Sequence, residues 1–172
     1  MLVFYNWVLI CVLTLIAGVG ELMFNSVRLF IPVFVVAAFY LFITNAWWRV
    51  LLPVTIMAVL LDLARGRLLV LNLLVLVVVY CIARYWSRYG SRRRYLPQFF
   101  PGAFLGGVSW VFSQLSETVS QDGWSALFSP RILLAGTLGA AVFGGIAAIG
   151  FSVLADALAR RCEMPTFIKE IQ

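Results

Sequence analysis

The sequence predicts an all-α, polytopic membrane protein whose six transmembrane helices form one bundle. Of its 172 residues, 63% are hydrophobic and only 12% are charged, and the mean hydropathy is +1.02. A soluble domain keeps about a quarter of its residues charged. A spanning helix needs about 20 apolar residues. Six such helices with short loops use nearly the whole chain, so we expect a single transmembrane domain over residues 1–172.

The first three apolar runs are separated by short polar breaks. They cover residues 2–20, 29–44 and 50–63. Pro32 stands near the start of the second run, where a missing N–H costs little. Trp47 and Trp48 follow that run and indicate a membrane interface, because indole rings favour the headgroup level. The third run is short, so tilting or snorkelling at its ends is expected.

Three further apolar runs complete the set of six. They cover residues 68–86, 97–115 and 132–158. Residues 116–130 form the longest predicted outer connection, which is either a plain loop anchored by Trp124 and Phe128 or a short interfacial helix over 124–128. We expect the first run to be a retained helix, since no basic segment precedes it.

Basic residues set the predicted orientation. If both termini are cytoplasmic, the loop between the fourth and fifth spans places five arginines inside, and Glu21 and Asp62 belong to outer loops. The positive-inside rule favours this arrangement. The five arginines are Arg84, Arg88, Arg92, Arg93 and Arg94.

This arginine cluster is interleaved with aromatic residues and resembles a platform on the inner leaflet. Each basic side chain near anionic lipid contributes about 1 kcal/mol, so membrane lipids explain the cluster without a further partner. Docking of a cytoplasmic protein is the sharper alternative. We attribute the net charge of +6 to cytoplasmic loops rich in arginine and lysine. We therefore expect no nucleic-acid partner.

The inventory of reactive side chains is sparse. Histidine is absent, and Cys11, Cys81 and Cys162 are scattered. We therefore expect no catalytic residues, no metal site and no cofactor, and predict that the chain is not an enzyme.

Two acidic residues lie near helix ends. Asp62 has Arg65 three residues later and Asp156 has Arg160 four residues later, so each acid can form a local helical ion pair. A structural role at a helix end is the favoured interpretation, with a functional intramembrane acid as the alternative. No special role is expected for three isolated asparagines, Asn6, Asn45 and Asn72.

The sixth run carries many small residues at helical spacing. Small residues four apart let helices approach closely. Packing inside the monomer is the favoured interpretation and a subunit interface is the alternative. The positions are Gly136, Ala140, Ala141, Gly144 and Gly145.

The segment Leu61-Asp62-Leu63, followed by Gly66 and a leucine-rich run, resembles the signature of the rod shape-determining protein MreD family. Pro32 at the start of the second span and the total length are also similar. The chain departs from the family pattern by lacking a glycine in the third span before Asp62. The resemblance is strongest over residues 28–86.

The resemblance implies a non-enzymatic scaffold of the bacterial inner membrane, multi-pass, within the cell-elongation machinery for cell shape and peptidoglycan synthesis. It implies a bitopic partner such as MreC and, through it, cell-wall synthesis proteins. It makes Asp62 and Gly66 a helix-turn motif. The family is also similar in fold to energy-coupling-factor substrate-binding subunits. One alternative is a vitamin-transporter subunit. Such subunits often carry an Ala-x-x-x-Ala motif in the first helix that docks their membrane partner, whereas the first span here has only the adjacent Ala17 and Gly18 as small residues, so this alternative is disfavoured. The other alternative is an accessory subunit of another membrane complex.

Overall fold

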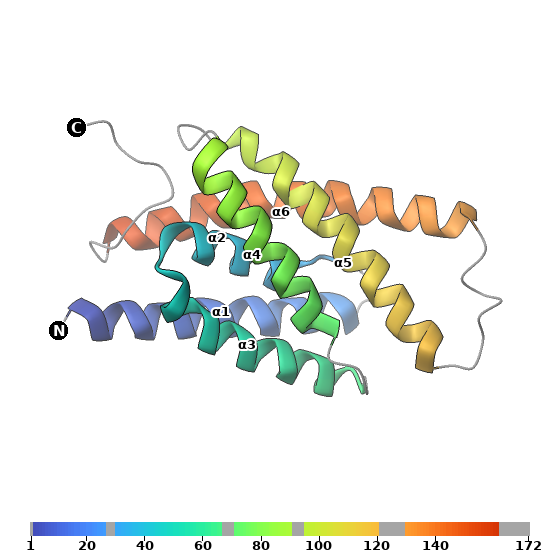
Figure 1. Ribbon diagram of the computed structural model, residues 1–172, viewed down its shortest axis with the longest axis horizontal. Coiled ribbons are helices and arrows are strands. Elements are labelled where there is room, and N and C mark those ends of the chain that lie inside the picture. The colour runs from blue at the N-terminus through green and yellow to red at the C-terminus, as the bar shows by residue number, and fades with distance from the viewer. Residues whose placement is uncertain (1, 27–29, 67–70, 91–94, 121–129, 162–172) are drawn as a thin grey trace.

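The computed structural model describes residues 2–26, 30–66, 71–90, 95–120 and 130–161. These residues form helices and no strand, which confirms the all-α class (Figure 1). The elements are α1 (Leu2–Ser26), α2 (Val33–Thr44), α3 (Trp47–Ala64), α4 (Leu71–Tyr89), a 3₁₀ turn η1 (Leu96–Gln98), α5 (Phe99–Ser120) and α6 (Pro130–Arg161).

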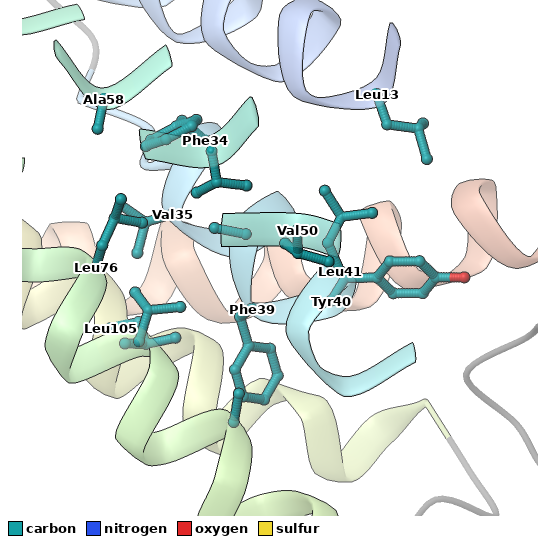
Figure 2. Packing of buried hydrophobic residues seen from close by; sticks show 14 of the residues in the cluster. Leu13, Phe34, Val35, Phe39, Tyr40, Leu41, Val50, Ala58, Leu76 and Leu105 are labelled. Carbon is teal, nitrogen blue, oxygen red and sulfur yellow. The ribbon is translucent and has the colours of Figure 1, made fainter. Parts of the chain in front are cut away.

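Helix α2 lies at the centre of the bundle and packs against α1, α3, α4, α5 and α6. It is apolar on all sides, and its residues from Phe34 to Leu41 are all buried. A helix that is hydrophobic all round belongs in an interior. Figure 2 shows its side chains among Leu13 of α1, Val50 of α3 and Leu105 of α5.

Successive helices run in alternating directions, so α1 begins and α6 ends at the same end of the bundle (Figure 1). We call this the terminal end, and the other the distal end. Among the described residues, four helices are long and apolar enough, in whole or in part of their length, to cross a membrane: α1, α3, α4 and α6. Many of their large apolar side chains face outward, including Leu15, Ile56 and Val77. Such a surface suits contact with lipid.

Several helix boundaries differ from those predicted. The second span was expected to start at residue 29, but α2 starts after Pro32 and has only 12 residues. Proline disfavours helical geometry in the residue before it. At about 1.5 Å per residue this helix is roughly 18 Å long, shorter than a bilayer core of about 30 Å.

The predicted end of the first span, at residue 20, was also wrong. Helix α1 continues through Gly20 and Glu21 to Ser26, because one interior glycine costs only about 1 kcal/mol and Glu21 finds partners inside the bundle. Helix α3 includes Trp47 and Trp48 and has 18 residues. The predicted interfacial helix over 124–128 lies outside the described residues.

Candidate functional site

At the distal end, Asp62 of α3 caps α4. The backbone N–H of Asn72 donates to its Oδ2 at 3.0 Å, and Asn72 Nδ2 donates to its Oδ1 at 2.8 Å. The first N–H groups of a helix have no partner within the helix, so a carboxylate there is stabilising. Asp62 is 1% exposed. Asn72, expected to have no special role, therefore ties α4 to α3.

Gly66 lies just after the end of α3, where the chain turns. Its φ is +66°, a left-handed conformation that glycine adopts without strain. This agrees with the expectation that Gly66 permits backbone angles closed to other residues. Asp62 and Gly66 thus lie on either side of the end of α3, and together they set the direction in which the chain leaves it.

A second distal carboxylate, Glu21, joins three helices. Arg65 Nη2 donates to its Oε1 at 2.6 Å, and the backbone N–H of Phe34 donates to its Oε2 at 2.9 Å. Glu21 was assigned to an outer loop, which is wrong: it belongs to α1 and its side chain is 3% exposed. Arg65 therefore forms an ion pair with Glu21, which is 44 residues away in sequence. The sequence had suggested Asp62, only three residues away, as its partner. The negative charge of Glu21 also stabilises the N-terminus of α2.

Near the terminal end, Asp156 of α6 is buried between two tyrosines. Tyr40 Oη of α2 donates to Oδ1 at 2.5 Å, and Tyr95 Oη donates to Oδ2 at 3.1 Å. Partial burial, and then the charge of Asp156, raise the pKa of the Tyr95 phenol above its ordinary 10.0, while Arg160 acts in the opposite direction. Asp156 thus links α6 to the central helix, a contact that the sequence, which predicted a local pairing with Arg160, did not reveal.

Asn6 and Asn45 form a smaller link at the same end. Asn6 Nδ2 donates to Asn45 Oδ1 at 3.2 Å, which joins the first turns of α1 to the α2–α3 turn. A polar side chain in an apolar interior is costly unless it is hydrogen-bonded. The expectation that these asparagines have no special role was therefore wrong.

The small residues of α6 pack against glycines of α5. A Cβ placed on Gly144 would lie 2.5 Å from the carbonyl oxygen of Gly102 and 2.9 Å from the Cα of Gly106. Ala140 also faces Gly106, and Ala148 faces Gly102. The two helix backbones therefore touch, as membrane helices do through small residues four apart.

The other small residues of α6 have different neighbours. Gly136 lies against the ring of Trp110 and Gly145 against the ring of Phe99, so both lie within the α5–α6 contact. Ala141 lines an apolar groove between the helices instead. Four of the five predicted positions thus pack inside this chain.

The apolar groove has a volume of about 460 Å³ and is open on one side. The small residues Ala103 and Gly107 of α5 and Ala141 of α6 line it, and Phe104 and Phe112 add aromatic surface. A partner helix can approach closely only where side chains are small.

The basic platform is described only in part. Arg84 and Arg88 are exposed on the last turns of α4, at the terminal end. Arg92, Arg93 and Arg94 lie outside the described residues. Within the described ranges, no group of three or more His, Cys, Asp or Glu side chains lies close enough to hold a metal ion.

Comparison with known proteins gives no match to a family model, to a curated protein or to a solved structure. In the part of the chain that the structure describes, all elements are helical and four helices are long and apolar enough to cross a membrane.

Sequence reasoning missed four residues that make these contacts. The spacing of Gly102 and Gly106 is a readable signal for a small-residue helix face and could have identified α5 as the partner of α6. Glu21 and Tyr40 gave no such signal, because their partners Arg65 and Asp156 lie 44 and 116 residues away in sequence.

Proposed function

We propose that this protein is a non-enzymatic scaffold of the bacterial inner membrane that holds the transmembrane helix of a bitopic partner, within the cell-elongation machinery. One observation carries the proposal. The buried carboxylates Glu21, Asp62 and Asp156 are each hydrogen-bonded to another part of the bundle. Their role is to hold the bundle in one shape. A rigid shape is what a scaffold requires.

The resemblance to the MreD family gives the proposal its biological setting. The residues that carry it, Asp62 and Gly66, lie where α3 ends. The Asp62 carboxylate caps α4, and the positive φ of Gly66 turns the chain at the end of α3. An MreC-like protein is the expected partner, and through it the cell-wall synthesis proteins.

The groove between α5 and α6 is the proposed seat of the partner helix. Its lining is apolar, and the small residues Ala103, Gly107 and Ala141 leave room for another helix to approach. In a membrane, helices associate by close packing since lipid tails are as apolar as the helices. A single spanning helix with a small or medium apolar face fits this surface.

The vitamin-transporter alternative is less favoured. Ala17 and Gly18 of the first helix are buried, and a Cβ on Gly18 would meet the side chain of Met57 on α3. They are used within the bundle and so are not presented to a coupling subunit.

Six spans with both termini in the cytoplasm complete the proposal. Arg84 and Arg88 lie at the bundle end where α1 begins and α6 ends, and the positive-inside rule assigns that end to the cytoplasm. Cysteine labelling at Ser91 and Ser120, in a variant whose three native cysteines are replaced by serine, tests the orientation. External labelling of Ser91 but not of Ser120 would reject it.

Co-purification in mild detergent tests the function. Wild-type protein should recover a bitopic membrane protein, Asp62→Ala should recover much less of it, and Asp62→Asn, which keeps an acceptor for Asn72, should recover an intermediate amount. An ATPase pair with a membrane coupling subunit, or tight vitamin binding by the purified protein, would reject the scaffold in favour of a transporter.

A further inference from the structure

A polar pocket lies where the α2–α3 turn meets the end of α4, at the terminal end of the bundle. Its volume is about 410 Å³. Side chains that can bind an anion or sit at a membrane interface contribute to its lining, among them Asn45, Trp47, Trp48, Tyr80, Arg84 and Ser87. Phe42 packs edge-on against Tyr80, with ring centroids 5.6 Å apart, and gives the pocket an apolar wall.

The charge at this pocket is positive. Arg84 lines it directly. The guanidinium carbon of Arg49 lies 4.7 Å from the ring centroid of Trp48, and Arg49 Nε is buried without a hydrogen-bond partner. None of the described lining residues is acidic. Arg49 does not line the pocket, but it stacks on Trp48, which does. A lining arginine with no carboxylate among the described lining residues favours an anion, and arginine suits phosphate because its fork of N–H donors can bind two oxygens.

The surface next to the pocket is apolar and points outward. Trp47 and Trp48 are 51% and 53% exposed, and one turn further along α3 Leu51 and Leu52 are also exposed. Tryptophans favour the headgroup level of a bilayer. The arrangement therefore combines an anion site with a track for hydrocarbon chains, which is the chemistry of a phospholipid.

We propose that this pocket binds the headgroup of an anionic phospholipid. Arg84 contacts the phosphate, Tyr80 and Ser87 of the lining supply hydroxyl groups, and the acyl chains lie against Leu51 and Leu52. Arg49, stacked on Trp48, adds positive charge next to the pocket. This inference does not depend on the scaffold function.

Native mass spectrometry of the full chain in a neutral detergent tests the proposal. The probes are phosphatidylglycerol and phosphatidylcholine with the same acyl chains. Wild-type protein should retain phosphatidylglycerol in preference to phosphatidylcholine. Arg84→Ala removes a charge-assisted contact and should weaken phosphatidylglycerol binding about tenfold. Arg161→Ala is the matched control, because Arg161 is an exposed arginine in the last turn of α6, outside the arginine cluster, and does not contribute to the described lining.

Three outcomes would overturn the proposal. One is equal retention of the two lipids by the wild type. Another is an equal loss of phosphatidylglycerol in Arg84→Ala and Arg161→Ala. The third is displacement of the lipid by glycerol phosphate at equal concentration, which would make the pocket a site for soluble anions. Elution volume and circular dichroism confirm that each variant is folded, and Arg84→Gln, which keeps side-chain length, replaces Arg84→Ala if that variant does not fold.

Discussion

The contact between α5 and α6 gives the sharpest mechanical prediction. A Cβ on Gly144 would lie 2.5 Å from the carbonyl oxygen of Gly102 and 2.9 Å from the Cα of Gly106. Carbon atoms pack best at about 3.5–4.0 Å. The helices must therefore separate by roughly 1 Å, and a gap of that size forfeits about a quarter to a half of each contact energy along the seam.

The magnitude follows from two opposing effects. Replacing glycine by alanine in a helix stabilises it by about 1 kcal/mol, whereas overpacking costs about 1–3 kcal/mol. We expect Gly144→Ala to be destabilised by about 1 kcal/mol and Gly144→Leu by about 3 kcal/mol. At about 2–4 °C per kcal/mol, the leucine variant should lose about 6–12 °C in Tm.

Gly139 is the matched control, because it lies on the same helix and a Cβ there would meet nothing within 4 Å. Gly139→Ala should gain stability and Gly139→Leu should leave Tm within a few degrees of the wild type. Tm is measured by the intrinsic fluorescence of the purified protein in detergent during heating. If Gly144→Leu and Gly139→Leu have the same Tm, the reasoning about backbone contact is wrong.

Three further predictions concern the buried carboxylates. Glu21→Gln leaves Arg65 buried without its counter-charge and should cost about 3–5 kcal/mol in the free energy of unfolding; adding Arg65→Met should recover part of this loss, and a double variant as unstable as the single one would contradict the pairing. Asp62→Ala leaves an N–H of α4 without its acceptor and should cost about 1–3 kcal/mol, measured by denaturant titration against Asp62→Asn. Asp156→Asn removes a negative charge beside Tyr95 and should lower the raised pKa of that phenol towards its ordinary value, as followed by absorbance at 295 nm; an unchanged titration would contradict the contact. Because the raised pKa favours the neutral phenol in the folded state, its contribution to stability is present below the ordinary pKa and is lost as the pH rises through the folded-state value.

Part of the site could be predicted from short-range patterns. The turn at Gly66 was readable because a glycine after an apolar run is a common helix stop, and its φ is indeed positive. The small face of α6 was readable because spacing along one helix fixes which residues share a face. The partner of Arg65 was not readable, since Asp62 and Glu21 both carry the required charge and only folding decides between them.

The sequence by itself determined that this is an all-helical protein with helices suited to a membrane. Composition and run length are properties of the chain in one dimension, and they decide how much apolar surface must be kept from water. Only the tertiary structure decided that the short helix α2 is the centre of the bundle, that Gly144 meets Gly102 and Gly106, and that Tyr40 reaches Asp156 across 116 residues. Close packing and hydrogen bonds act over a few ångströms, so their partners are set by the three-dimensional arrangement of the helices rather than by distance along the chain.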